Sequence, residues 1–393
     1  MTRRAGLIAA TSISILFALA GRAQAQSAPP DSASAPPPAP VTPEIPVAQT
    51  PADFPRGRIS GLAFLDIYYN VDGDRRHAYD AAGNDSGQVA IDGKKPITKD
   101  LNGILIRRVY FQLDSDLSYR FAARFRLETD SKELTSGGKI GVFVKAAYLQ
   151  AKSVFTRSDF YIGMINTPTF ENSEEFWGYR SVEKTIADFR GVASSSDLGG
   201  ELKGFADPNH HVGYGLMVGT GTGQKPETDR YKRVYFTLPI RFGALRLEPY
   251  TDYQVVRVTP AAINNDQATY KAFAGYELRR TAIGAEALTR VLHKGTSATE
   301  EQRGYSVFVR QTVSPAFAAF ARFDLWNPNH RVDNRVDQQM WIGGVDWQPL
   351  KDVHVMPNLE LLKYDAKGTA VAPAHDDVQA RVTFYYRFSK PQS

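Results

Sequence analysis

The strongest constraint on the fold of this chain is a two-residue alternation of apolar and charged side chains that recurs along most of its length. Between Tyr119 and Asp130, aromatic or aliphatic side chains alternate with arginines and acids. Successive side chains of a β-strand point to opposite faces, so this segment predicts a strand with one apolar and one charged face. The same pattern precedes it over 109–113, and we expect Asp114-Ser115-Asp116 to form a tight hairpin turn between the two strands.

Sixteen segments of this kind follow one another from Arg58 onward. Most are about ten residues long, which is the length that a tilted membrane-spanning strand requires. The predicted strands are 58–70, 103–114, 118–130, 140–152, 158–166, 198–206, 211–220, 230–238, 244–258, 268–278, 281–292, 304–313, 316–326, 338–347, 353–363 and 378–388. Pro249 and Pro357 lie inside two of them, and there we expect bulges or rim positions.

The connections between these strands alternate in length. Short turns alternate with long polar connections, which are 71–100, 131–139, 167–196, 221–229, 259–267, 293–303, 327–337 and 364–377. This alternation is typical of a membrane barrel with short periplasmic turns on one rim and long external loops on the other. The sequence therefore predicts an all-β fold, a single 16-stranded antiparallel transmembrane β-barrel.

The two faces of the predicted strands indicate which side of the barrel faces water. Sixteen strands enclose a hollow that is too wide for side chains to fill, so the charged faces belong inside and the apolar faces outside. Apolar faces then meet lipid, and closure of the barrel leaves no unpaired strand edge in the bilayer.

The N-terminal segment predicts export. Residues 1–25 have the pattern of a secretory signal peptide, with Arg3 and Arg4, an apolar run and Ala23-Gln24-Ala25 as the cleavage site, so we expect a bacterial outer-membrane location. Without this segment the net charge falls from +5 to +2, because it contains three arginines and no acid, and nothing in this charge favours nucleic-acid binding.

The regions outside the predicted barrel are short. Residues 26–56 are rich in Pro and Ala and predict an extended periplasmic linker, either a spacer reaching toward the cell wall or a featureless connection. We expect the barrel to span 57–388 and a short C-terminal extension to occupy 389–393.

Several segments resemble one family of porins. They are I-R-R-V-Y-F-Q-L (106–113), F-A-A-R-F-R-L-E (121–128), K-A-A-Y-L (145–149), Y-I-G-M (161–164), Y-R-S-V-E-K (179–184) and D-L-G-G-E-L-K-G (197–204). Their order is similar to that of the phosphate-selective porin O and P family, and V-T-F-Y-Y-R-F (382–388) resembles the closing strand of outer-membrane barrels. The resemblance covers roughly 58–388 and implies a trimeric, anion-preferring porin with a long loop folded into its lumen.

The charged faces supply candidate pore-lining residues. Arginine suits oxyanions because its planar fork can donate two hydrogen bonds, and rings of Arg or Lys are used in anion pores. The strand register predicts that nine cations line the lumen and bind anions: Arg108, Arg124, Arg126, Lys145, Arg233, Arg246, Arg310, Arg322 and Arg381. Acids on the same faces, such as Glu128 and Glu248, leave a second interpretation open, in which the arginines only pair with carboxylates and hold water.

The connection 167–196 is the candidate constriction. Its aromatic residues argue against disorder, and long loops in compact structures are often functional. If it folds inward, Arg180 and Lys184 lie one helical turn apart and could line the narrowest point together with Trp177 and Glu183. Packing against the rim or against a neighbouring subunit is the alternative.

Enzyme and cofactor signatures are absent from the sequence. There is no cysteine, no G-x-S-x-G and no H-E-x-x-H, so we expect no catalytic residues, no cofactor and no metal. The glycine-rich stretch 219–223 opens no helix, and we interpret it as a mobile external loop. His210 and His211 are adjacent, so on a strand they would face opposite ways and not share a metal.

The leading hypothesis is an outer-membrane porin for passive or facilitated diffusion of small anions, either phosphate-like or carboxylate-bearing. Its expected partners are outer-membrane lipid, the anions and two further copies of the chain in a homotrimer. The alternatives are a general non-selective porin, a plugged structural or adhesive barrel with ligand-binding external loops, and a barrel enzyme, which would need a Ser/His/Asp set on one rim.

Overall fold

The computed structural model describes residues 53–131, 134–258, 263–295 and 297–391. The predicted signal peptide and residues 26–52 of the predicted linker lie outside this part of the chain. Within it, no helix is long and apolar enough to cross a membrane.

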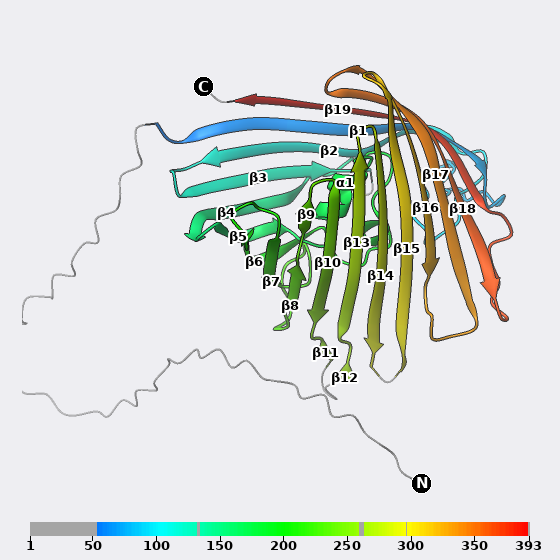
Figure 1. Cartoon of the computed structure of the whole chain (residues 1–393). Coiled ribbons are helices and arrows are strands. Elements are labelled where there is room, and N and C mark those ends of the chain that lie inside the picture. The colour runs from blue at the N-terminus through cyan, green and yellow to red at the C-terminus, as the bar shows by residue number, and fades with distance from the viewer. Residues whose placement is uncertain (1–52, 132–133, 259–262, 296, 392–393) are drawn as a thin grey trace, which may run out of the picture. The chain divides into compact units, whose positions relative to one another are not determined.

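The described chain is a β-barrel of antiparallel strands (Figure 1). Its strands are β1 (Arg56–Asp72), β2 (Asn102–Asp116), β3 (Phe121–Thr129), β4 (Phe143–Phe155), β5 (Ser158–Asn166), β6 (Ser196–Phe205), β7 (Gly213–Gly219), β8 (Arg233–Thr237), β9 (Ile240–Phe242), β10 (Leu245–Gln254), β11 (Arg257–Val258), β12 (Ile263–Asn264), β13 (Gln267–Leu278), β14 (Thr281–Lys294), β15 (Ser297–Ser314), β16 (Phe317–Asn327), β17 (Arg335–Leu350), β18 (Val353–Lys367) and β19 (Asp377–Pro391). The helices α1 (Glu171–Trp177) and α2 (Ile186–Phe189) both lie in the connection between β5 and β6.

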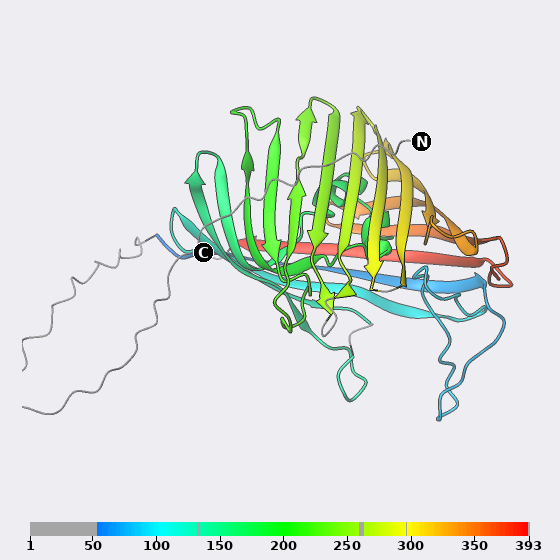
Figure 2. The same ribbon diagram turned by 90° about the horizontal axis from the view of Figure 1, so that it is seen from below.

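The barrel closes between its first and last strands. β1 pairs with β2 on one side and with β19 on the other, and Figures 1 and 2 show β1 and β19 side by side. β8 and β9 both pair with β10 and form two halves of one interrupted strand, so the barrel has sixteen strand positions. β11 and β12 form a separate small hairpin in one connection. The predicted fold class is confirmed, and each predicted strand has a counterpart in this order.

Two prolines lie at interruptions of the sheet. Pro249 in β10 stands opposite the break between β8 and β9, where Tyr250 pairs with Thr237 and Leu247 with Ile240. Proline has no N–H to donate, so the only backbone bond at the break that involves Pro249 is the one its carbonyl accepts from the Leu238 N–H at 3.1 Å. Pro357 in β18 likewise lies between the paired positions Val355 and Asn358, at a place where the pairing to β17 is irregular.

The predicted hairpin turn at 114–116 is wrong. Asp114 and Asp116 belong to β2, and the turn lies at 117–120, where the Leu117 N–H donates to the Phe121 carbonyl. The register pairs Asp114 with Arg124 and Asp116 with Ala122. In the pairing with β1, Asp114 stands opposite Arg58 and Asp116 opposite Arg56, so both carboxylates are wall groups with arginines as cross-strand neighbours. At the other end of the chain, β19 continues past the predicted end at Phe388 to Pro391.

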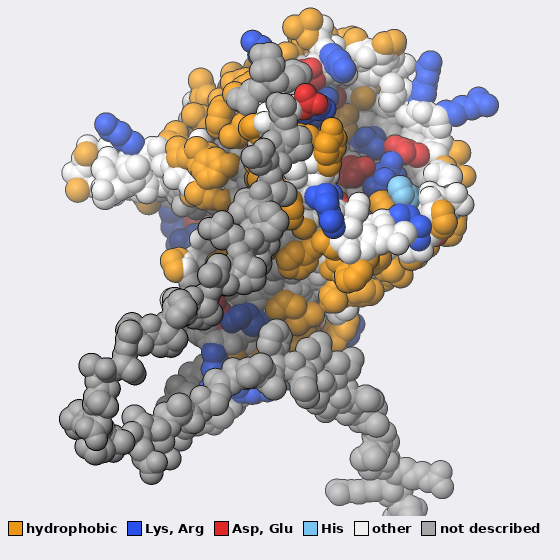
Figure 3. Space-filling view, turned by 90° about the vertical axis from the view of Figure 1, so that its left-hand side faces the viewer, with side chains coloured by type: hydrophobic (Ala, Val, Ile, Leu, Met, Phe, Trp, Pro, Cys, Tyr) orange, Lys and Arg blue, Asp and Glu red, His pale blue; other side chains and the backbone are white. Residues whose placement is uncertain are grey.

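The two faces of the strands differ as expected. In β1, Asp66 and Asn70 are fully buried, whereas Ile67 and Tyr69 between and beside them are 48% and 44% exposed. Figure 3 shows the same contrast, with acidic and basic side chains gathered in a recess that hydrophobic side chains surround. The charged faces point into the barrel and the apolar faces point away from it.

Candidate functional site: a charged lumen and its inserted loop

The connection 167–196 folds into the barrel, as Figure 1 shows for α1. Phe176 and Trp177 at the end of α1 pack against the inward-facing aromatic residues Phe273, Phe308 and Phe320 of β13, β15 and β16. Gly275 leaves room for this contact, since a Cβ there would lie 2.7 Å from the Phe176 ring. The loop is therefore held by an apolar core on one wall, formed by β13 to β18.

Lumen arginines anchor the backbone of this loop. Arg107 donates to the Val182 carbonyl at 2.7 Å and pairs with Glu183 at 2.9 Å. Arg381 donates to the same carbonyl at 2.9 Å, and Arg322 donates to the Lys184 carbonyl. Peptide carbonyls inside a barrel need donors because they have lost water, and these guanidinium groups supply them.

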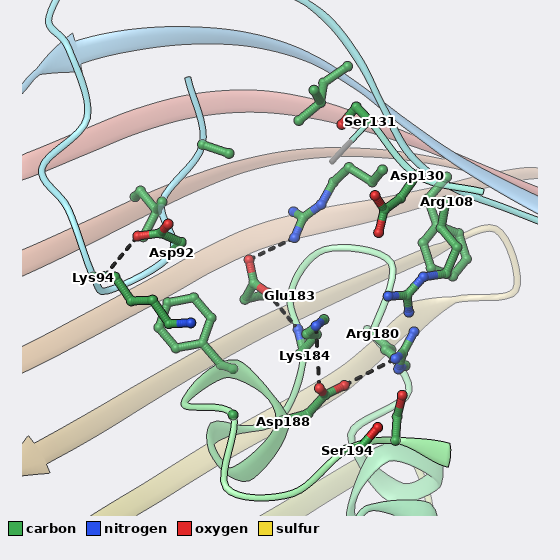
Figure 4. Close-up of a pocket in the computed structure, with 18 of the residues that line it drawn as sticks. Asp92, Lys94, Arg108, Asp130, Ser131, Arg180, Glu183, Lys184, Asp188 and Ser194 are labelled. Carbon is green, nitrogen blue, oxygen red and sulfur yellow. Dashed lines mark hydrogen bonds and ion pairs between the residues drawn. The ribbon is translucent and has the colours of Figure 1, made fainter. Parts of the chain in front are cut away.

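The space that remains runs along the opposite wall, formed by β1 to β4. A loop-rim cavity of about 370 Å³ is lined by Phe64, Arg107, Arg108, Arg180 and Lys184, among others (Figure 4). Asp188 lies at its floor, paired with Arg180 at 3.0 Å and with Lys184 at 3.3 Å. Positively charged side chains from the wall and from the loop thus point into one space.

Three more cavities continue this row toward the short turns. A middle cavity of about 200 Å³ shares Phe64 and Arg180 with the loop-rim cavity. A turn-rim cavity of about 480 Å³ shares Leu62, Tyr110 and Arg126 with the middle one. The last, of about 400 Å³, is lined by Arg58, Arg124 and Lys152, and Arg58 also lines the turn-rim cavity. We call these four spaces the lumen path.

Most cations of the lumen path have a carboxylate partner. Arg108 and Lys145 both pair with Glu128, at 2.6 and 3.1 Å. Arg124 and Arg58 share Asp114, at 2.5 and 3.0 Å. These pairs lower the free positive charge that a passing solute would meet.

Arg126 differs from them. No carboxylate of the described residues forms an ion pair with it; its Nε donates to Gln112 Oε1 at 2.6 Å, and its guanidinium lies 5.1 Å from the centre of the Tyr110 ring. It lines both the middle and the turn-rim cavities. Its remaining N–H donors therefore face the path with an unmatched charge.

The nine predicted pore-lining cations divide into two groups. Arg108, Arg124, Arg126 and Lys145 line the lumen path, and Arg310 lines a fifth cavity beside it. Arg233, Arg246, Arg322 and Arg381 also face inward but line none of these five cavities. Arg322 and Arg381 are buried and bonded to the inserted loop, Arg233 is buried against Asp252, and Arg246 pairs with Glu175 of α1.

The predicted constriction residues are also divided. Arg180, Glu183 and Lys184 line the loop-rim cavity, whereas Trp177 is fully buried in the apolar core, and its Nε1 donates to the Glu183 carbonyl at 2.9 Å. Trp177 was expected to line the constriction, but its ring instead fastens the loop to the wall.

Arg107 was absent from the predicted set. A strict alternation sends Arg107 and Arg108 to opposite faces, but a β-bulge places both inside: Phe64 pairs with Arg108, Leu65 pairs with Ile106, and Arg107 is the extra residue. Lys145 occupies the same kind of bulge between β3 and β4. Two adjacent arginines in a strand were the only sequence sign of this arrangement.

The inserted loop also contains a buried acid that sequence patterns did not single out. Glu174 pairs with Arg180 at 2.6 Å, and its Oε1 is buried without a hydrogen-bond partner. Burial and the nearby Asp188 carboxylate raise the pKa of Glu174 well above its ordinary range.

The glycine-rich motif has a structural role, and no metal site is found in the described part of the chain. In the glycine-rich stretch 219–223, Gly221 and Gly223 donate their N–H groups to the Asp197 carboxylate at 2.8 and 3.1 Å, so this segment wraps a carboxylate of β6. Among the described residues, no cluster of acids and histidines has the geometry to hold a metal ion.

Comparisons with known proteins support the fold. No family model matches the chain, and no curated protein matches it. Many solved structures do, among them an anion-selective porin from Comamonas acidovorans, with 13% identity, a TM-score of 0.58 and coverage of 85% of this chain and 100% of the other.

Two further structures are similar to this chain. The outer membrane channel DcaP of Acinetobacter baumannii has 12% identity, a TM-score of 0.60 and coverage of 86% and 99%. OmpT of Vibrio cholerae, an outer membrane protein solved in a trimer form, has 13% identity, a TM-score of 0.54 and coverage of 86% and 100%. The chain thus has the β-barrel fold of outer-membrane porins and channels.

Proposed function

We propose that this protein is an outer-membrane porin through which small anions diffuse passively. The observation that carries the proposal is Arg126, an unmatched guanidinium in the middle of the lumen path. In a narrow passage with low-dielectric walls, a single unmatched cation raises the local concentration of anions. Phosphate-like and carboxylate solutes both fit a guanidinium fork.

The membrane location rests on the outer face of the barrel. Large apolar side chains there are exposed, for example Ile104 at 75%, Ile162 at 53% and Val307 at 51%. A soluble protein rarely exposes so many large apolar side chains to water, whereas in a membrane these side chains contact lipid. We propose the bacterial outer membrane as the location and a homotrimer as the assembly, by analogy with the trimer form of the similar OmpT structure.

The row of cavities favours conduction over a plugged barrel. The inserted loop packs on the wall formed by β13 to β18, and the four cavities of the lumen path lie along β1 to β4. An adhesive barrel would not need a path lined by cations from one rim to the other.

A catalytic role has less support. Asp346 and His354 pair at 3.0 Å, and Ser181 lines the same cavity, but its Oγ donates to Met356 Sδ at 3.8 Å. A serine nucleophile would need to donate to the histidine, so the set is not arranged for acyl transfer.

The test is a planar-bilayer recording in a KCl gradient. The reversal potential of the wild-type channel is expected to show chloride preference over potassium. Arg126→Gln should lower the permeability ratio of chloride to potassium roughly twofold to fivefold, as expected for loss of one partly screened charge. A cation-preferring wild type would contradict the proposal.

Arg290→Gln is the matched control. Arg290 also faces inward, and no carboxylate in the described part of the chain forms an ion pair with it. It donates to the Gly191 carbonyl and to Gln267, but it lines none of the five cavities. We expect its effect on the reversal potential to be clearly smaller. Equal effects of the two variants would mean that only total charge matters and would argue for a non-selective porin with a general positive bias.

A further inference from the structure

One strip of the lumen path is apolar. In β1, the inward-facing positions are polar near the long loops, where they are Asp66, Tyr68 and Asn70, and polar again near the short turns, where they are Arg58 and Ser60. Between these two groups the inward-facing positions are Leu62 and Phe64. Leu62 and Phe64 each line three of the five cavities. β1 thus presents apolar groups to the lumen at these two positions, between polar inward-facing positions on either side.

This strip continues onto neighbouring strands. The Phe64 and Tyr385 rings lie 5.5 Å apart, and Tyr385 and Met356 line the fifth cavity together with Leu62 and Phe64. On the other side, Tyr110 lines the middle and turn-rim cavities beside Leu62. The apolar strip is defined as Leu62, Phe64, Tyr110, Met356 and Tyr385. Its first three members border three of the four cavities of the path, and its last two border the fifth cavity beside it.

The cations lie directly beside this strip. Arg126 and Arg108 lie over the Tyr110 ring, at 5.1 and 5.7 Å, and Arg124 lies over the Tyr148 ring at 5.7 Å. Stacking covers the face of a guanidinium and leaves its edge, which carries the N–H donors, free to bind a planar oxyanion. A solute in the middle of the path thus meets donors on one flank and hydrocarbon on the other.

We propose that the preferred substrates of this pore are organic carboxylates with an apolar body, whose carboxylate binds Arg126 while the body lies along the apolar strip. The inference rests on the proposed porin function and names its substrate class. Inorganic phosphate could use the arginines and the tyrosine hydroxyls, but it has no apolar surface to place against Leu62 and Phe64, which offer it no hydrogen bonds. A carboxylate with an aliphatic or aromatic body gains binding free energy from both sides of the path, because its charge meets the N–H donors and its body meets the hydrocarbon.

The test compares three probes of known chemistry in bilayers that contain the full-length channel. Sodium acetate, sodium hexanoate and sodium phosphate are titrated against a fixed chloride current. Hexanoate is expected to halve this current at a concentration roughly fivefold to tenfold below that of acetate, because part of its extra hydrocarbon contacts the strip. Phosphate should halve the chloride current only at a concentration at least as high as that of acetate.

Variants of the strip separate binding from folding. Leu62→Ser should reduce the advantage of hexanoate over acetate to less than about twofold, while Leu62→Met, which keeps an apolar side chain, should retain it. A circular dichroism spectrum and a thermal unfolding midpoint in detergent that match the wild type in both variants serve as the check that the channel is folded. Arg126→Gln should weaken acetate and hexanoate alike, since it removes the group that holds the shared carboxylate.

The two proposals fail in different ways. A wild-type channel that prefers potassium in KCl would overturn the porin function as proposed. A chloride-preferring channel in which hexanoate and acetate act equally, or in which phosphate acts at the lowest concentration, would overturn only the substrate class. Retention of the hexanoate advantage in Leu62→Ser would also overturn the role of the strip.

Discussion

Arg107 and Arg108 are neighbours in β2, yet both side chains point into the barrel. Arg108 pairs with Glu128 of the wall at 2.6 Å, whereas Arg107 reaches the inserted loop and pairs with Glu183 at 2.9 Å. The bulge at Arg107 makes this division possible, since it adds one residue to β2 without a partner in β1. Both arginines line the loop-rim cavity, but Arg108 is held by the wall, whereas Arg107 holds the loop that narrows the path.

Arg107→Gln should destabilise the barrel by about 2–3 kcal/mol, because Glu183 and Asp66 are buried and would lose a charged partner. Urea unfolding in detergent measures this change. Arg335→Gln is the control: Arg335 pairs with Asp337 near the long-loop rim, where both side chains are about one-fifth exposed, and its loss should cost about 1 kcal/mol or less. Equal costs would mean that the contact of Arg107 with the loop does not stabilise the fold.

Asp114→Asn should increase the chloride preference of the channel. Asp114 is the shared partner of Arg58 and Arg124, so its neutralisation leaves two guanidinium groups of the lumen path without an ion pair. The expected change in the permeability ratio is roughly twofold to threefold, opposite in sign to that of Arg126→Gln. Reversal potentials in a KCl gradient measure it, and a shift toward potassium would contradict the placement of Asp114 on the path.

Trp177→Ala should release the inserted loop. Trp177 is fully buried and contacts Phe308 and Phe320, so its truncation should lower the free energy of unfolding by about 3–5 kcal/mol through lost packing. Single-channel conductance should rise and become noisier, because the loop no longer holds one position. Trp347→Ala is the matched control, since Trp347 is 45% exposed on the outer face. A conductance that stays at the wild-type level in Trp177→Ala would show that the loop does not set the width of the path.

The chloride preference should fall as pH rises. Burial and Asp188 raise the pKa of Glu174, so this carboxyl loses its proton only above the ordinary range of glutamate, and ionisation adds a negative charge beside Arg180. Reversal potentials measured across this range should drift toward potassium in the wild type. In the Glu174→Gln variant this side chain cannot ionise. The variant should therefore show no drift and should keep, at every pH, the reversal potential that the wild type has at low pH. A drift of the same size in the variant would assign the titration to another group.

The fold could be predicted in detail because its physical basis is local. A two-residue period and the alternation of short and long connections depend only on neighbouring residues, and they yielded sixteen strands in the correct order. The misplaced turn at 114–116 has a clear cause: acidic residues are common in turns, but here Asp114 is stabilised by arginines from two other strands. That contact involves residues up to 56 positions apart in the chain.

The candidate site could be predicted only in part. The alternation by itself determined most of the side chains that face inward, such as Arg108, Arg124 and Arg126, but it missed Arg107, which a bulge brings inside. Only the tertiary structure decided which inward arginines border open space and which hold the loop, because that depends on the wall against which 167–196 packs. Its apolar residues bury themselves on β13 to β18, which occupies Arg322 and Arg381 and leaves Arg126 free along β1 to β4. The packing of a long loop depends on residues that are distant in the chain, so no periodicity in the sequence predicts it.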